Sequence, residues 1–188
     1  MERSFAAPRK YEEYAYVLDY VTRGRATTVR GREGIIITAI GEDRLTLLEV
    51  LGTEGSAFDI GERIYIGKEG RTKIMSVLGK LEYAHISAAA QSELKNVITT
   101  IVTNNEKRFV DYINNAQPLT PRIHALELIP GIGKTYMKTI LEEREKTKFA
   151  SFADLQERVG LKDPIKHIID RIMDEITGEV KVTLFVKK

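Results

Sequence analysis

The sequence predicts an α+β protein with a strand-rich N-terminal half and a helical C-terminal half. In the first half, apolar residues alternate with polar ones or run together in short segments, which is the strand pattern. In the second half they recur every three to four residues, which is the helical spacing. Glycine and proline interrupt that spacing near residues 130–133 and 160–164, so we expect several short helices there.

Five strands are expected in the N-terminal half. Residues 14–21 alternate, residues 35–40 form a continuous apolar run, and residues 44–51 follow a short turn at positions 41–43. Residues 63–66 and 81–86 are two shorter candidates. Five strands with one tight hairpin fit a small barrel better than a sandwich, which usually needs about seven strands.

This layout over residues 11–87 resembles the OB fold, a five-stranded barrel that often binds single-stranded nucleic acid. The resemblance implies that the face of the second and third strands and the adjoining loops receive the ligand. A solvated arginine-rich loop is the equally weighted alternative for the first of those loops. The candidate nucleic-acid-binding residues of this part are Arg23, Arg25, Arg30 and Arg32 in the first loop and Lys68, Arg71 and Lys73 in a second basic segment.

Residues 88–117 are predicted to form a helical connector. Ser87 can cap a helix that begins at Ala88, and a second helical run spans residues 105–115. A polar segment ending in Pro118 stops the helical pattern, which places a domain boundary near Gln117. The last ten residues, 179–188, alternate and are expected to form a terminal strand or a tail.

The turn at residues 130–134, Pro-Gly-Ile-Gly-Lys, is the most informative motif. We expect Thr120 and Pro121 to open the helix before it, and residues 134–146 to form the helix after it. The two glycines allow positive φ and close approach, while the following helix begins with unpaired amides and a partial positive charge. That arrangement suits a phosphate group.

The segment 126–140 resembles the helix-hairpin-helix motif of DNA-repair and recombination proteins. The resemblance makes Gly131, Gly133, Lys134, Thr135 and Lys138 the candidate phosphate contacts, with Ile132 as a buried plug that shapes the turn. Met137 stands where the family usually has a small residue. A turn that serves geometry alone, or a protein contact, is the alternative reading.

A second, altered copy follows, so the resemblance to a tandem helix-hairpin-helix domain covers residues 118–178. Gly160 matches Gly131, but Lys162 replaces the second glycine. Asp163 and Pro164 open the next helix, where the carboxylate would occupy the amides itself and proline donates none. We therefore expect the second hairpin to be mainly structural.

Composition favours a non-catalytic, cytoplasmic protein without cofactor or metal. The chain has no cysteine, and its three histidines form no metal-binding pair. A nucleotide-binding P-loop would need glycine where Leu128 stands. The net charge of +2 identifies no partner by itself, and no segment has the length and hydropathy of a signal peptide or a membrane span.

The whole arrangement resembles an uncharacterised archaeal family described only as predicted nucleic-acid binding. Our hypothesis is therefore largely sequence-tolerant nucleic-acid binding, with RNA slightly favoured over DNA. A metal-dependent nuclease or modification enzyme is the first alternative; the carboxylates at 142–143 and 170–175 fit a solvated helix face better than a metal site. The second alternative function is that of an assembly factor, which contacts a ribosomal or transcription protein.

Overall fold

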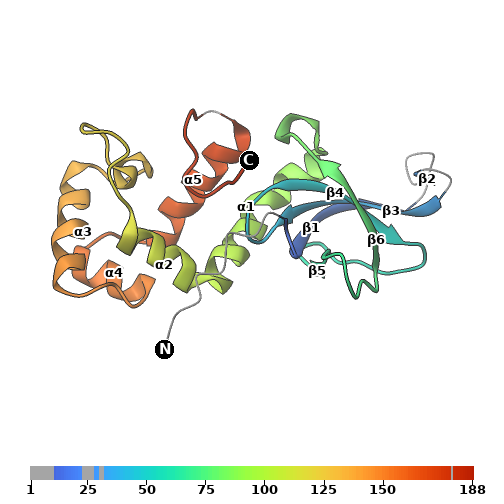
Figure 1. Ribbon diagram of the computed structural model, residues 1–188, viewed down its shortest axis with the longest axis horizontal. Helices are drawn as coiled ribbons and strands as arrows, with labels where there is room; N and C mark the ends of the chain where they lie inside the picture. The colour runs from blue at the N-terminus through green and yellow to red at the C-terminus, as the bar shows by residue number, and fades with distance from the viewer. Residues whose placement is uncertain (1–10, 23–27, 30–31, 179) are drawn as a thin grey trace. The chain divides into compact units, whose positions relative to one another are not determined.

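The structure is a computed structural model that describes residues 11–22, 28–29, 32–178 and 180–188 (Figure 1). The chain forms two compact units. The sheet unit lies within residues 1–97 and 185–188, and the helical unit comprises residues 98–184. Helix α1 (Ala88–Asn104) begins in the first unit and ends in the second, so residues 88–117 are shared between them.

The sheet unit is one antiparallel sheet with the strand order β5-β1-β3-β4-β6, and a short strand β2 pairs with β3 away from this path. Three consecutive long strands, β1, β3 and β4, lie side by side, and β5 returns to lie beside β1, which is a Greek-key order. The strands are β1 (Tyr14–Val21), β2 (Thr28–Val29), β3 (Arg32–Gly41), β4 (Leu47–Thr53), β5 (Arg63–Tyr65) and β6 (Ile74–Lys80).

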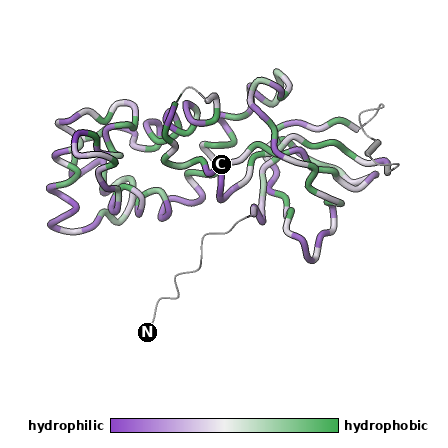
Figure 2. Tube along the Cα trace, turned by 45° about the horizontal axis from the view of Figure 1, so that its top comes forward, coloured by the Kyte–Doolittle hydropathy of each residue, from purple (hydrophilic) through white to green (hydrophobic). Residues whose placement is uncertain are grey.

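The core of the sheet unit follows from the two-residue period of the strands. Ile35, Ile37 and Ala39 of β3 point to the same face and are buried there. Figure 2 shows green hydrophobic stretches along the strands. The same core cluster takes residues from the other long strands and from β5, namely Ala15, Val17, Leu48, Val50, Ile64 and Ile74, and two residues outside the strands, Phe58 and Ile66.

The last of the five predicted strands is not where the sequence placed it. Residues 81–86 form no strand; a 3₁₀ turn, η2 (Tyr83–His85), replaces it, and none of its three side chains is buried. The alternation there has no sheet face to pack against. The strand that completes the sheet is β6, an edge strand in which Ile74 is the one buried residue. Because so few of its side chains are buried, its sequence shows no clear alternation of apolar and polar residues.

The helical unit contains the end of α1, then α2 (Glu106–Asn115), a 3₁₀ turn η3 (Ala125–Leu128), α3 (Lys134–Lys146), α4 (Phe152–Val159) and α5 (Pro164–Thr177). Helix α3 packs against η3 and α4, and α4 packs against α5. The predicted cap of α1 is confirmed, because the Ser87 hydroxyl accepts a hydrogen bond from the Ala90 amide at 3.1 Å.

The predicted helix from Thr120 to residue 129 is wrong. The Thr120 hydroxyl accepts hydrogen bonds from the amides of Arg122 (3.2 Å) and Ile123 (3.0 Å), which closes a local turn instead of starting a helix. Helical structure begins only after His124, whose backbone is extended, and lasts for the four residues of η3. The side-chain hydrogen bonds of threonine thus compete successfully with the helix.

The described part of the C-terminal segment, residues 180–188, is a tail and not a strand. Its end is held on the turn between β3 and β4: the Lys187 amide donates to the Arg44 carbonyl at 3.0 Å, and the Thr46 hydroxyl donates to the Lys187 carbonyl at 3.3 Å. Across the described residues, no helix combines the length and apolar character needed to cross a membrane.

Candidate functional site

The turn before α3 contains two glycines, Gly131 and Gly133. Only Gly131 has backbone angles that require glycine. Gly131 has a φ of +84°, whereas Gly133 has a φ of −81° and a ψ of −177°, the extended conformation of a helix N-cap. The positive φ that glycine allows is thus used at Gly131 alone. Ile132 is buried at 3% exposure, which confirms its predicted role as the plug of the turn.

Helix α5 supports this turn through His167. The Nδ1 atom of His167 lies 2.8 Å from the Pro130 carbonyl oxygen and, as the protonated nitrogen, donates to it. A β-carbon added at Gly131 would lie 2.3 Å from the same Nδ1 atom. Gly131 is thus required both by its φ and by the imidazole packed against it.

The amino end of α3 is open. Gly133, its N-cap, provides no side-chain cap, and the first turn of the helix contains no acidic residue. Its first amides therefore have no helical partner. Lys134, Thr135 and Tyr136 are exposed beside them. Lys134 makes no ion pair with any residue that the structure describes, and the ion pair from Lys138 to Glu142 is long, at 3.9 Å.

The next two helices of the unit begin differently. At α4 the Ser151 hydroxyl accepts from the Asp154 amide at 3.0 Å, and at α5 the Asp163 carboxylate accepts from the Lys166 amide at 3.4 Å. Pro164 occupies the first turn of α5. The second turn otherwise repeats the first, since Gly160 has a φ of +78° and is followed by the buried Leu161. The predicted capping of α5 by Asp163 is confirmed.

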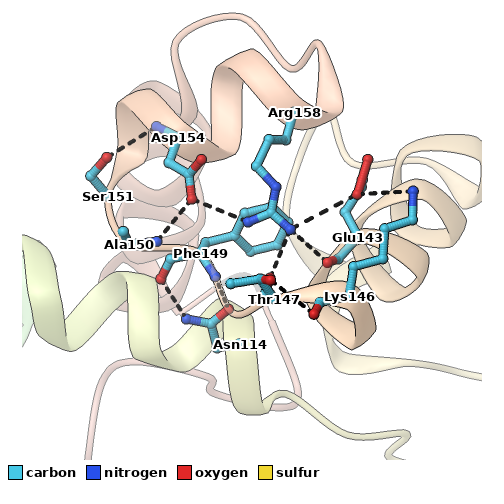
Figure 3. Close-up of polar contacts among 9 residues, drawn as sticks. All are labelled: Asn114, Glu143, Lys146, Thr147, Phe149, Ala150, Ser151, Asp154 and Arg158. Atoms are coloured by element: carbon cyan, nitrogen blue, oxygen red, sulfur yellow. Dashed lines mark hydrogen bonds and ion pairs between the residues drawn. The ribbon is translucent and has the colours of Figure 1, made fainter.

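A polar network fixes the segment between α3 and α4 (Figure 3). Asn114 is buried and binds both backbone groups of Phe149: its Nδ2 donates to the carbonyl at 2.9 Å, and its Oδ1 accepts from the amide at 2.8 Å. Arg158 donates to the carbonyls of Glu143 and Thr147 at 2.6 and 2.7 Å, which closes the carboxyl end of α3.

Asp154 orients that arginine and holds the start of α4. Its carboxylate accepts from the Ala150 amide at 3.0 Å and from Arg158 at 3.1 Å. These hydrogen bonds, that from Ala150 first, lower the pKa of Asp154. The network involves no residue of the open turn, so it positions α3 without occupying its amino end.

Two buried polar groups support the other side of the turn. Arg171, only 6% exposed, donates from Nε to Glu175 at 2.9 Å and from Nη1 to the Leu128 carbonyl at 3.1 Å. His124 caps η3 by accepting from the Leu126 amide at 3.1 Å. Burial, and then the charge of Arg144, lower the pKa of His124, which keeps the ring neutral as an acceptor requires.

The basic residues of the sheet unit that were predicted to bind nucleic acid differ in their contacts and exposure. Arg71 is engaged within the unit, since it donates to the carbonyls of Ile66 (3.1 Å), Gly67 (2.6 Å) and Met75 (3.1 Å). Lys73 pairs with Glu62 at 2.9 Å, while Lys68 is exposed. In the first loop, Arg23, Arg25 and Arg30 lie outside the described residues, and the structure describes only the backbone of Arg32, at the start of β3.

Within the part of the chain that the structure describes, no three residues of the types His, Cys, Asp and Glu form a group that could hold a metal ion. Tyr136, 38% exposed in the first turn of α3, lies beside the candidate phosphate contacts, and the sequence analysis did not single it out. Its position in the first turn of the predicted helix, next to Lys134 and Thr135, would have pointed to it.

Comparison with known proteins gives consistent results. Residues 11–187 match the family model described as protein of unknown function (DUF655). The chain is 41% identical over 182 residues to the uncharacterized protein MJ0038 of Methanocaldococcus jannaschii, covering 96% of this chain and 82% of that protein. The crystal structure of Af1531 from Archaeoglobus fulgidus is similar with a TM-score of 0.82 and 39% identity, covering 94% of this chain and all of that one. Both relatives are archaeal, as the sequence predicted.

Proposed function

Because the chain belongs to the DUF655 family of unknown function, we propose its role from geometry: it binds nucleic acid without catalysis and largely without sequence preference. In this proposal the helical unit is a tandem helix-hairpin-helix domain that holds phosphate at the amino end of α3. The sheet unit is an OB-like barrel that adds contacts to the same nucleic acid.

The repeated turn supports the first part of the proposal. In each copy a glycine of positive φ is followed by a buried aliphatic residue, Ile132 or Leu161, and then by a helix. The first copy departs from a full hairpin because a single 3₁₀ turn, η3, stands where its first helix would be. Since η3 still packs against α3, the turn keeps its support.

The strand order supports the second part. An OB fold is a partly open five-stranded Greek-key barrel. The order β5-β1-β3-β4-β6 is of that kind, and its two edge strands, β5 and β6, do not pair with each other.

The observation that carries the proposal is the contrast between the starts of α3 and α5. Both helices follow a glycine turn with a buried plug, but the amides of α5 already have an anionic partner in Asp163. The amides of α3 have no such partner, and Lys134, Thr135 and Lys138 lie beside them. A phosphate at α3 would take the place that the carboxylate takes at α5.

The test is to give α3 the cap that α5 has. The variant Gly133→Asp fits the extended φ and ψ, and a β-carbon there has no atom within 4 Å. The carboxylate should leave the fold as stable or slightly more stable, because an anionic N-cap is favourable. It should weaken binding about tenfold or more, since charge-assisted hydrogen bonds contribute about 1.5–3 kcal/mol.

Fluorescence anisotropy with RNA and DNA, single-stranded and duplex, over a range of salt concentrations measures this effect. The loss of one phosphate contact should reduce the salt slope by ~0.9 for duplex DNA or ~0.7 for a single strand. Gly133→Asn is the matched control, with the same shape and no charge, and should lose less. A folded Gly133→Asp protein with unchanged affinity and slope would falsify the phosphate site.

A further inference from the structure

The sheet unit contains a groove of about 1110 Å³ that both edge strands line. Because β5 and β6 do not pair with each other, the barrel is open between them, and the groove lies in this opening. Its lining includes Leu48 of β4, a residue of the sheet core. The residues that matter for its chemistry are Tyr11, Leu48, Tyr65, Lys68, Val77 and Lys80.

The groove combines exposed apolar surface with positive charge. Tyr11 is 64% exposed and Val77 is 37% exposed, so the ring of the one and the side chain of the other present apolar surface that a ligand could cover. The Lys68 ammonium lies 5.1 Å from the centroid of the Tyr11 ring, and Lys80 is exposed at the end of β6. Neither lysine has an ion-pair partner among the residues that the structure describes.

Basic residues outnumber acidic ones in the lining of the groove, with Arg44, Lys68, Arg71, Lys80 and Lys188 against Glu12, Glu13 and Glu69. The carboxylate of Glu12 accepts from the amides of Asp43 at 2.9 Å and Arg44 at 2.6 Å, so it serves the turn between β3 and β4. Glu69 is exposed on the loop between β5 and β6, next to Lys68. An anionic ligand therefore meets two available ammonium groups beside an exposed tyrosine ring.

The edges themselves are poor templates for an added β-strand. Arg71 already donates to carbonyls on both sides of the opening, Ile66 and Gly67 at the end of β5 and Met75 in β6. Strand β5 is only three residues long, and the pairing of β6 shifts register twice. Short, irregular edges with occupied carbonyls oppose strand addition, which disfavours an extended peptide as the occupant.

We infer that this groove binds a short single-stranded stretch of nucleic acid. A base stacks on Tyr11 and covers the apolar surface around Val77, while phosphates contact Lys68 and Lys80. Aromatic rings with flanking cations are the usual means of holding a single strand. A duplex does not fit this role, because its base faces are already stacked on one another. This inference rests on the proposed function and assigns the single-strand contact to the β5–β6 opening.

The experiment uses the full chain and two labelled probes, a twelve-nucleotide oligouridine strand and an RNA duplex of the same length. The groove variant combines Tyr11→Ala, Lys68→Gln and Lys80→Gln, all at exposed positions. It should bind the single strand about five- to 150-fold more weakly, as expected for the loss of one stacked base. Its salt slope should fall by about 1.4, or ~0.7 for each lysine contact.

Duplex affinity should stay unchanged in the groove variant and fall in Gly133→Asp. The matched control replaces two exposed lysines outside the groove, Lys95→Gln and Lys107→Gln, and should bind both probes like the wild type. Photo-crosslinking of a strand that contains 4-thiouridine should label the peptide with Tyr11.

The other outcomes distinguish a failure of the groove inference from a failure of the proposed function. If the groove variant binds the single strand normally while Gly133→Asp loses binding, the groove inference is wrong and the proposed function stands. If neither probe binds the wild type, the proposed function fails, and the groove inference fails with it. If free uridine monophosphate displaces the strand at equal concentration, the groove is a mononucleotide site, which overturns the strand assignment.

Discussion

Replacing Gly131 with alanine tests the architecture on which the candidate site depends. The residue has a φ of +84°, and left-handed backbone costs an L-residue about 1–2 kcal/mol. The added β-carbon would also lie 2.3 Å from Nδ1 and 2.4 Å from Cε1 of His167. Displacing that ring from a packed site costs about 1–3 kcal/mol and breaks its hydrogen bond to Pro130.

The two costs add to about 2–5 kcal/mol, and the lower entropy of the unfolded alanine variant offsets about 0.4–1 kcal/mol. We therefore expect Gly131→Ala to lower the free energy of unfolding by about 1–4.6 kcal/mol, with a midpoint of ~3 kcal/mol. Two other glycines calibrate this value. Gly160→Ala has the same backbone strain, at a φ of +78°, but its added β-carbon has no atom within 4 Å. We therefore expect it to lower the free energy of unfolding by about 1 kcal/mol. Gly133→Ala has neither cost and should be nearly neutral.

Urea denaturation followed by circular dichroism at 222 nm measures the three variants against the wild type. The expected order of destabilisation is Gly131→Ala, then Gly160→Ala, then Gly133→Ala. Equal losses for Gly131→Ala and Gly160→Ala would refute the packing of His167 on the turn. A loss for Gly133→Ala as large as that for Gly131→Ala would refute the assignment of positive φ to one glycine alone.

Two further predictions concern the supporting network. Asn114→Ala leaves both backbone groups of Phe149 without their partner and should cost about 2–4 kcal/mol, while a loss below 1 kcal/mol by urea denaturation would contradict the paired hydrogen bonds. In the folded protein the pKa of His124 is lowered from 6.5, first by burial and then by the charge of Arg144. Below about pH 6.5 the His124 ring therefore binds a proton more readily in the unfolded chain than in the folded one. The free energy of unfolding should therefore fall as pH drops below about 6.5, and His124→Asn should remove that part of the slope; an identical pH profile in the variant would disprove it.

Several site residues were predictable because their roles depend on near neighbours in the sequence. The buried plug Ile132, the bounds of α3 and the cap Asp163 all follow from local spacing and from turn chemistry. Arg71 illustrates the opposite case. Composition marks it as a basic residue on a loop, whereas the fold directs its guanidinium to carbonyls at the end of β5 and in β6.

The sequence by itself determined the α+β class, most of the strands and helices, and the contrast between an open turn at Gly133 and a capped one at Asp163. These features depend on periodicity and on contacts within about four residues. Only the tertiary structure decided the edge strand β6, the shortened η3, the packing of His167 against Gly131, and the groove between β5 and β6. Each of these depends on residues far apart in the chain, where the cost of closing a loop is repaid by contacts that no local pattern encodes.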